Sequence, residues 1–245
     1  MLRINEIFGP TIQGEGAAAG RHCVFIRTAL CNLTCTWCDT PYTWAFTPDK
    51  ADYTHSGQIY NREENVRRMT TEEVLLALEA RWPIRENPTI VVVSGGEPML
   101  QQKDLIPVVR DLCDFENLVH IETAGTIIPK SEFDEHITQY NISPKLENSG
   151  NKLDLRYKPK VISHFADDPR AWFKYVCISP FDLAEVDRQV QAHGISPGRV
   201  MVMPEGTTVA HNRMIAQRIA TQAIERGYGV SFRSHVLLWG GERGR

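Results

Sequence analysis

The chain has 245 residues, of which 42% are hydrophobic and 23% are charged, and its formal net charge is −3. These values are ordinary for a globular protein with a sizeable core, and the length suits one barrel or α/β domain. The small acidic excess gives no electrostatic reason to expect a nucleic-acid partner. No apolar run approaches the ~20 residues that cross a membrane, and the N-terminal residues lack the apolar core of a signal peptide. We therefore expect a cytoplasmic protein.

Seven short segments rich in Val, Ile, Phe and Tyr are predicted to be strands. Several are continuously apolar, which is typical of parallel strands buried on both faces. Four longer segments are predicted to be helices, the first of them capped by Thr70 or Thr71 and acidic in its first turn. Alternating strands and helices indicate a parallel α/β fold. The predicted strands are 23–27, 89–94, 118–122, 139–143, 174–179, 200–204 and 230–233, and the predicted helices are 71–80, 105–115, 181–193 and 209–226.

Residues 44–68 do not fit this alternation, because they are polar and lack periodicity. Loops of this length are uncommon in compact domains and are usually lids, binding loops or disordered segments. We interpret 1–245 as a single domain with a polar insertion at about 44–68. The sequence leaves open whether this insertion is solvated or contributes to a site.

Polar or glycine-marked residues follow several of the predicted strands. The strand endings include SGGEP at 94–98, ETAG at 122–125, SPK at 143–145, MPEG at 203–206 and RSH at 233–235. In barrel-type α/β folds the loops after the strands converge on one face. The sequence therefore predicts one site at the carboxyl ends of the strands.

Three of the six cysteines, Cys31, Cys35 and Cys38, form a CxxxCxxC cluster after the first predicted strand. Soft thiolates of this kind select zinc, Cu(I) or iron–sulfur clusters. Structural zinc needs four ligands, and only Cys23 or His22 could supply a fourth. Three thiolates on a four-iron cluster instead leave one iron open for a substrate. The other three cysteines lie in apolar surroundings and are expected to be packing residues: Cys23, Cys113 and Cys177.

The CxxxCxxC loop resembles the signature of the radical S-adenosylmethionine superfamily, and residues 94–98 are similar to its GGEP motif. The resemblance implies that the open iron binds the amino and carboxylate groups of S-adenosylmethionine. An electron from the reduced cluster then cleaves the sulfonium and yields a 5′-deoxyadenosyl radical. The sequence departs from the pattern at Leu30, where many members have glycine before the first cysteine.

A narrower resemblance covers nearly the whole chain. QGEG at 13–16, VFIR at 24–27, CDT at 38–40, SPK at 143–145 and the closing WG and RG pairs are similar to the 7-carboxy-7-deazaguanine synthase family. That family forms 7-carboxy-7-deazaguanine from 6-carboxy-5,6,7,8-tetrahydropterin with loss of ammonia, on the path to queuosine. The resemblance implies a partial, modified (β/α)6-type TIM-like barrel of mostly parallel strands. It also implies a [4Fe–4S] cluster, S-adenosylmethionine, Mg²⁺, an electron donor such as flavodoxin or ferredoxin, and a homodimer.

The resemblance also assigns site residues. The implied cluster ligands are Cys31, Cys35 and Cys38, and the implied magnesium ligand is Thr40. The residues implied to bind S-adenosylmethionine are Trp37, Cys38, Asp39, Gly96, Glu97, Ser143, Pro144 and Lys145. The residues implied to bind the pterin are Ile12, Gln13, Gly14, Glu15, Arg27, Ser94, His235 and Arg245.

Simpler structural roles stay open for several of these residues. Arg27 offers a planar fork for a carboxylate, or it forms a strand-end salt bridge. His235 approaches the pterin, or it is a hydrogen-bonded structural histidine. Thr40 binds magnesium through its hydroxyl, or it bonds the loop backbone. Two rival functions are the activase of a glycyl-radical enzyme and a zinc-stabilised binding module.

Overall fold

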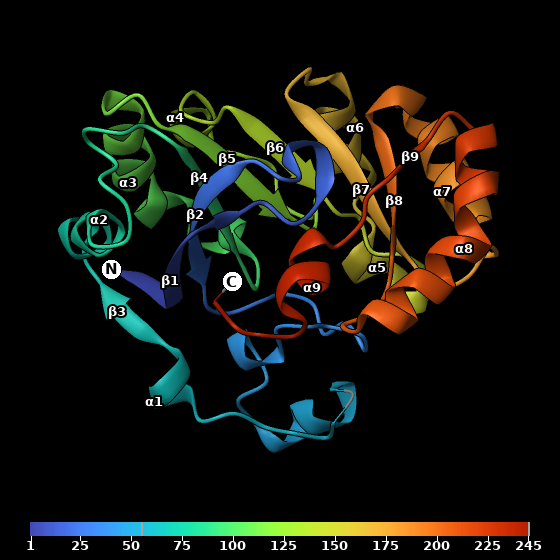
Figure 1. Ribbon diagram of the computed structural model, residues 1–245, viewed down its shortest axis with the longest axis horizontal. Helices are drawn as coiled ribbons and strands as arrows, with labels where there is room; N and C mark the ends of the chain where they lie inside the picture. The colour runs from blue at the N-terminus through green and yellow to red at the C-terminus, as the bar shows by residue number, and fades with distance from the viewer. Residues whose placement is uncertain (55, 245) are drawn as a thin grey trace.

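The computed structural model describes residues 1–54 and 56–244, and it contains one nine-stranded sheet in the order β3-β1-β2-β4-β5-β6-β7-β8-β9 (Figure 1). The neighbours from β2 to β9 are parallel, whereas β1 pairs antiparallel with both β2 and β3. The order has two ends and does not close, which confirms the predicted partial barrel of mostly parallel strands. The strands are β1 Leu2–Ile12, β2 His22–Thr28, β3 Arg67–Met69, β4 Ile90–Gly95, β5 Leu118–Thr123, β6 Gln139–Ile142, β7 Ala171–Cys177, β8 Val200–Pro204 and β9 Gly229–Val230.

The larger helices lie along the outer side of the curved sheet (Figure 1). In α3 the apolar stripe of Leu105, Val108, Val109 and Leu112 is fully buried. Burying each such side chain contributes about 1.5–3 kcal/mol relative to leaving it exposed. No helix in the described part of the chain is long and apolar enough to cross a membrane. The helices are α1 Arg62–Asn65, α2 Thr71–Glu79, α3 Gln102–Asp114, α4 Ser131–Asp134, α5 Leu153–Arg156, α6 Pro159–Asp167, α7 Asp182–His193, α8 Val209–Glu225 and α9 Ser234–Trp239.

The apolar run in β4 is buried on both of its faces. Val91 and Val93 belong to the main core cluster beneath the helices. Val92 belongs to a second, smaller cluster with Ala18 and Cys23. Because successive side chains of a strand point to opposite faces, a strand buried twice must be continuously apolar. The structure therefore confirms that this run is continuously apolar because the strand is buried on both faces.

Two errors in the predicted elements affect the site. The eleven-residue strand β1 was not predicted, because Gly9 and Pro10 interrupt it and its register shifts twice against β2. The strand predicted over 230–233 is wrong, since β9 ends at Val230 and α9 begins at Ser234. His235 therefore lies in the first turn of a helix and not at a strand end. The first predicted helix begins correctly, because Thr70 caps α2 in a capping box with Glu73.

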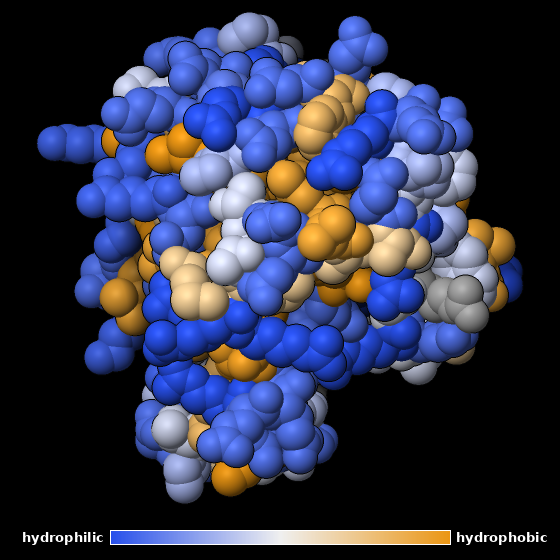
Figure 2. Space-filling view, turned by 90° about the vertical axis from the view of Figure 1, so that its left-hand side faces the viewer, coloured by the Kyte–Doolittle hydropathy of each residue, from blue (hydrophilic) through white to orange (hydrophobic). Residues whose placement is uncertain are grey.

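The segment 44–68 is more integrated than its polarity suggests. It begins with the buried residues Trp44 and Ala45, and it ends in β3, which extends the sheet beside β1. Asn65 is buried, and its carbonyl accepts a hydrogen bond of 2.7 Å from Asn5 Nδ2. The part between these ends forms the mostly hydrophilic lower lobe in Figure 2. A solvated insertion is thus correct only for the middle of this segment.

Candidate active site

A cavity of about 650 Å³ opens at the carboxyl ends of the parallel strands. This volume lies within the range of small-molecule sites. The loops after β2, β4, β5, β6 and β8 all contribute lining residues, as the polar strand endings predicted. One part of the wall carries the cysteine loop, and another part carries a chain of charged side chains.

The cysteine loop places Cys31, Cys35 and Cys38 on the same cavity wall. The segment after β6 anchors this loop, because the Thr36 amide donates to the Ser149 carbonyl at 3.0 Å. Burial raises the pKa of all three thiols, that of Cys38 to about 11. The thiols are therefore protonated at neutral pH unless a metal replaces the proton.

Each of the three sulfurs accepts an N–H hydrogen bond. The donors are the Leu33 amide to Cys31 at 3.4 Å, Asn151 Nδ2 to Cys35 at 3.2 Å and Trp44 Nε1 to Cys38 at 3.3 Å. Such donors stabilise sulfur that carries negative charge, as it does when it ligates iron. The residues present therefore suit a cluster held by three thiolates.

The geometry does not suit a structural zinc. In residues 1–54 and 56–244, no three His, Cys, Asp or Glu side chains converge on a point that one ion could occupy. Cys23 is buried in the core, and His22 Nδ1 bonds the Thr89 hydroxyl at 2.7 Å. Neither residue can serve as the fourth zinc ligand. The described residues therefore offer no four-ligand zinc site around the three cysteines.

Leu30 adopts a conformation that favours glycine. Its φ is +75°, and its backbone is held on both sides, by Thr43 and by Glu97. Its amide donates to the Thr43 carbonyl at 2.8 Å, and its carbonyl accepts from the Glu97 amide at 2.9 Å. A Cβ on Gly96 would lie 2.1 Å from the Leu30 carbonyl oxygen. The close approach of these two loops thus maintains the backbone path despite the leucine.

Glu97 is buried behind the cavity wall and stabilises the loop that forms it. Its carboxylate is fully buried and accepts hydrogen bonds from the Met99 amide at 3.0 Å, the Thr123 hydroxyl at 2.8 Å and the Ala124 amide at 2.8 Å. Burial raises the pKa of Glu97, and these donors partly offset that effect. Ser94, Gly95 and Gly96 of the motif line the cavity, whereas Glu97 does not. The structure therefore places Glu97 behind the cavity wall, where it supports the loop.

The SPK segment after β6 reaches the cavity at two of its three residues. Ser143 and Lys145 line the cavity, whereas Pro144 is buried between them. Lys145 Nζ donates to the Ser143 carbonyl at 2.7 Å and to its hydroxyl at 2.9 Å. The same ammonium lies 5.8 Å from the centroid of the Trp37 ring. At this end of the cavity the Lys145 ammonium and the Trp37 indole therefore lie together beside the cysteines.

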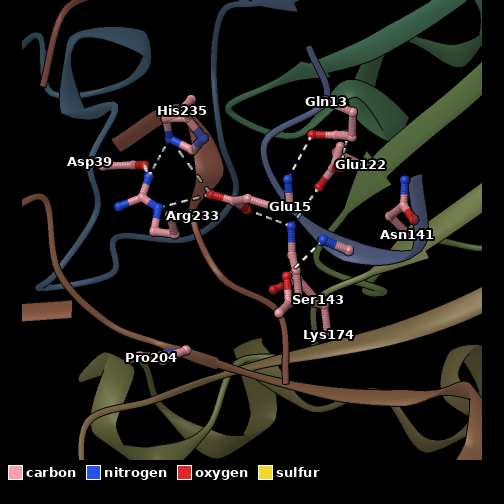
Figure 3. Close-up of polar contacts among 12 residues, drawn as sticks. Gln13, Glu15, Asp39, Glu122, Asn141, Ser143, Lys174, Pro204, Arg233 and His235 are labelled. Atoms are coloured by element: carbon pink, nitrogen blue, oxygen red, sulfur yellow. Dashed lines mark hydrogen bonds and ion pairs between the residues drawn. The ribbon is translucent and has the colours of Figure 1, made fainter. Parts of the chain in front are cut away.

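A chain of alternating charges forms another part of the cavity wall (Figure 3). Lys174 Nζ lies 3.0 Å from Glu122 and 2.7 Å from Glu15. Arg233 continues the chain, at 2.8 Å from the other Glu15 oxygen and in contact with Asp39. Burial alone would raise the pKa of Glu15, but the two cations outweigh it and hold that pKa well below its usual range. Burial acts to lower the pKa of Lys174, but its two carboxylates outweigh it and raise that pKa. Glu15, Lys174 and Arg233 therefore persist as ions at neutral pH.

The QGEG turn lies directly against this wall. Gln13 Nε2 donates to Glu122 at 2.9 Å, and Ile12 also lines the cavity. A Cβ on Gly14 would lie 1.9 Å from His235 Nδ1, and the Gly14 carbonyl accepts from the Ser234 amide at 2.9 Å. Glycine is therefore required for α9 to approach the turn. Burial lowers the pKa of His235, and neighbouring Glu15 partly offsets this.

Arg27 lines the cavity and forms an ion pair at the same time. Its Nε donates to Glu6 Oε1 at 2.7 Å, and its guanidinium lies 5.2 Å from the centroid of the Phe8 ring. The second Glu6 oxygen accepts from Arg243 Nε at 3.0 Å. Glu6 thus joins Arg27 to the C-terminal segment. Ser94 lines the same cavity, and Arg245 lies outside the described residues.

Thr40 also lines the cavity, two residues after Cys38. Its hydroxyl lies 3.7 Å from the Cys38 sulfur. Its carbonyl, and not its hydroxyl, organises the turn, since it accepts from both the amide and the hydroxyl of Thr43. The hydroxyl therefore remains on the cavity side, where an ion could use it.

Five residues of the site had no role assigned from sequence. Lys174 begins a strand that is predicted to be buried. A lysine beside the apolar run YVCI indicates a charged side chain that faces the interior. Glu122 ends a strand, but the sequence does not show its partners. Nothing local in the sequence indicated the contacts of the other three, Trp44, Asn151 and Arg233.

The open, mostly parallel α/β barrel and the three separated sulfurs on the loop after its first parallel strand define an iron–sulfur enzyme of the radical S-adenosylmethionine type. A family profile described as a 4Fe-4S single cluster domain matches residues 12–142. The chain is 33% identical to the 7-carboxy-7-deazaguanine synthase of Pyrobaculum aerophilum, over 100% of this chain and 97% of that protein. It is 32% identical to that of Hyperthermus butylicus, over 97% of this chain and 93% of that protein. The chain belongs to the 7-carboxy-7-deazaguanine synthase family.

A solved structure shares the fold. The crystal structure of QueE from Escherichia coli superposes with a TM-score of 0.66, covering 96% of this chain and 94% of that one. The two sequences are 24% identical over this alignment. The match supports the open, mostly parallel α/β barrel as the architecture of this chain.

Proposed function

We propose that this protein converts 6-carboxy-5,6,7,8-tetrahydropterin to 7-carboxy-7-deazaguanine with release of ammonia, a step toward queuosine and other 7-deazapurines. One observation carries the proposal: three cysteines suited to a cluster and a chain of carboxylates and cations line the same cavity. Family membership supports the same reaction.

Cys31, Cys35 and Cys38 would hold the [4Fe–4S] cluster, and the neighbouring residues would hold S-adenosylmethionine. These groups together supply, when bound, the one-electron cleavage that yields a radical able to abstract hydrogen. Of the residues that would bind the nucleotide, those that line the cavity are Trp37, Cys38, Asp39, Gly96, Ser143 and Lys145. Their part is to hold the nucleotide against the cysteine loop and to keep water out of the cavity.

The charged part of the wall would hold the pterin. The carboxylate oxygens of Glu15 and Glu122 would accept hydrogen bonds from an amino group and ring N–H groups, while Lys174 keeps the two side chains together. Arg27 uses its Nε for Glu6, which leaves the other guanidinium nitrogens for the substrate carboxylate. Gln13 adds an amide edge beside Glu122. These contacts would fix the orientation of the ring and so determine which hydrogen is abstracted.

Magnesium and the partners belong to the same proposal. Thr40 would contribute its hydroxyl to Mg²⁺, which takes its other oxygens from substrate and water. An electron donor such as flavodoxin or ferredoxin would reduce the cluster, and the enzyme would act as a homodimer in the cytoplasm, where thiols stay reduced. The whole of 1–245 would act as one unit.

Anaerobic turnover tests the proposal. Reconstituted protein should bind ~4 iron and ~4 sulfide per chain. With reductant, S-adenosylmethionine and the carboxytetrahydropterin it should release ammonia and the deazaguanine. Cys35→Ala should lose the cluster and all turnover, whereas Cys113→Ala, the matched control outside the cavity, should keep both. Stoichiometric zinc without iron uptake would contradict the proposal.

A further inference from the structure

Two hydrogen bonds to cysteine sulfur come from residues outside the recognised motifs. Asn151 Nδ2 lies 3.2 Å from Cys35 Sγ and is 116 positions away in the chain. Trp44 Nε1 lies 3.3 Å from Cys38 Sγ. Both sulfurs belong to the cluster ligands, so both bonds point at the atoms that would carry the charge of the cluster.

The orientation of the Asn151 amide is fixed by its other partner. The Thr34 amide donates to Asn151 Oδ1 at 2.9 Å. The oxygen is therefore occupied by an N–H donor, and the NH₂ group must be the end that faces Cys35. The adjacent Ser149 accepts the Thr36 amide and so ties the same segment to the cysteine loop. The donor is thus part of the platform that carries the loop.

The Trp44 indole has only one possible role toward the sulfur. An indole nitrogen is a donor and never an acceptor. The residue is 7% exposed, and its amide donates to the Pro41 carbonyl at 3.0 Å, which fixes its place at the cavity wall. The start of the 44–68 segment therefore reaches back to the last cluster ligand.

We propose that Asn151 and Trp44 are positioning residues that raise the reduction potential of the cluster held by Cys35 and Cys38. The inference rests on the proposed function only for the presence of the cluster. A one-electron donor of low potential adds one electron to the oxidised cluster, without a proton, so the reduced cluster carries one more negative charge. An N–H dipole aimed at a ligand sulfur stabilises the more negative state. The two bonds therefore favour the reduced cluster.

Replacement of Trp44 tests the proposal by potentiometric titration followed by electron paramagnetic resonance. Trp44→Phe keeps an aromatic ring and removes the donor. At a fixed ambient potential we expect roughly a tenfold lower ratio of reduced to oxidised cluster, which corresponds to about 59 mV for a one-electron couple. Trp82→Phe is the matched control, because the Trp82 indole donates to the Asn87 carbonyl outside the cavity. It should titrate like the unsubstituted enzyme.

A second variant keeps the test decisive if Trp44→Phe does not retain iron. Asn151→Asp preserves the acceptor for Thr34 but replaces the donor with a carboxylate oxygen. The reduction potential of the cluster should therefore fall at least as far as in Trp44→Phe. Iron and sulfide are counted in every sample before titration. Variants that retain the cluster and titrate like the unsubstituted enzyme would overturn the inference and leave the proposed function intact. Failure of the unsubstituted protein to bind iron would instead contradict the proposed function.

Discussion

Glu15 and Lys174 are 159 positions apart in the chain, yet their charged atoms lie 2.7 Å apart on the cavity wall. The side chains are only 17% and 6% exposed, so neither charge is well solvated. Arg233 holds the other oxygen of Glu15, and Glu122 holds Lys174 from the far side. The turn that follows β1 and the strand β7 are therefore joined by an ion pair at the cavity wall.

Removing the central cation should destabilise the fold. In Lys174→Met, Glu15 and Glu122 would face each other with one cation fewer, and breaking a buried pair in this way costs about 3–5 kcal/mol. Urea denaturation of the variant measures the loss, and Lys160→Met, at an exposed position on α6, is the control. In Glu15→Gln/Lys174→Met the two effects should not add, with a coupling of about 1–3 kcal/mol. Strictly additive losses would mean that the pair does not interact.

Arg243 should affect substrate affinity although it acts through Glu6. In Arg243→Gln, Glu6 loses one of its two cations and no longer fixes Arg27 as firmly. We expect KM for the pterin to rise roughly fivefold to tenfold while kcat changes little, which is about 1–1.4 kcal/mol of binding. Arg218→Gln, at an exposed position on α8, should match the unsubstituted enzyme. A fall in kcat at unchanged KM would contradict this role.

Arg27 itself should be sensitive to a conservative change. Arg27→Lys keeps the charge but loses the planar fork that can bond Glu6 and a carboxylate together. We expect much weaker binding of the carboxypterin and nearly unchanged binding of S-adenosylmethionine, both measured by calorimetry. Normal binding of both ligands would make Arg27 a purely structural residue.

Thr40 should determine the response to magnesium and not the stability of the fold. Its hydroxyl faces the cavity and takes no part in the turn. Thr40→Ala should therefore keep its iron content and thermal stability, but show reduced turnover and a weaker dependence on magnesium concentration. Thr40→Ser retains the hydroxyl and should retain much of both. Steady-state rates against magnesium concentration distinguish the cases, and an unaltered response in Thr40→Ala would remove the residue from the ion site.

His120 should make stability depend on pH. Burial, with a smaller contribution from Arg21, lowers its pKa from 6.5 to about 4. The unfolded chain then binds the proton more readily than the folded protein. The stabilisation is therefore complete above about pH 6.5 and is lost as the pH falls toward 4. Between pH 7.5 and 5 the loss should be about 2 kcal/mol.

The measurement is urea denaturation at several pH values. His120→Leu cannot titrate, so its stability should vary less over the same interval. His136→Gln, which removes a different histidine from the half-exposed region after α4, should retain the pH dependence of the unsubstituted protein. An identical pH profile in His120→Leu would assign the effect to other groups.

Leu30 should tolerate glycine better than other leucines do. A left-handed conformation costs a non-glycine residue about 1–2 kcal/mol, whereas glycine costs about 0.5–1 kcal/mol through its freedom in the unfolded chain. Leu30→Gly should therefore be at least as stable as the unsubstituted protein. Leu100→Gly, at an exposed position outside that conformation, should lose about 1 kcal/mol. A larger loss at Leu30 than at Leu100 would show that its side-chain contacts outweigh the strain.

The sequence predicted most of the sheet, because strands buried on both faces must be continuously apolar. This applies to β4 and to β7, whose apolar residues required no knowledge of their partners. It failed for β1, which carries the polar residues Asn5 and Glu6 and in which the register shifts break the alternation. It also failed at residues 231–233, since this segment follows the end of β9 and leads into α9.

The cysteine loop could be located from spacing alone, since its ligands lie within eight residues. The charged wall could not, because Lys174 and Arg233 find their partners 159 and 218 positions away. Contacts between residues so far apart in the chain produce no periodic pattern in a single sequence. The donors to sulfur are hidden for the same reason, as Asn151 shows.

The contact between Glu6 and Arg243 joins the start of the sheet to a segment that the ribosome makes 237 positions later. Arg243 also lies 4.0 Å from the centroid of the Tyr42 ring, beside the cysteine loop. Because synthesis proceeds from the N-terminus, the parallel strands and all three cysteines emerge before this wall of the cavity exists. A nascent chain therefore passes through a stage in which the cysteine loop is complete but the cavity lacks the lining that residues 233–244 later supply.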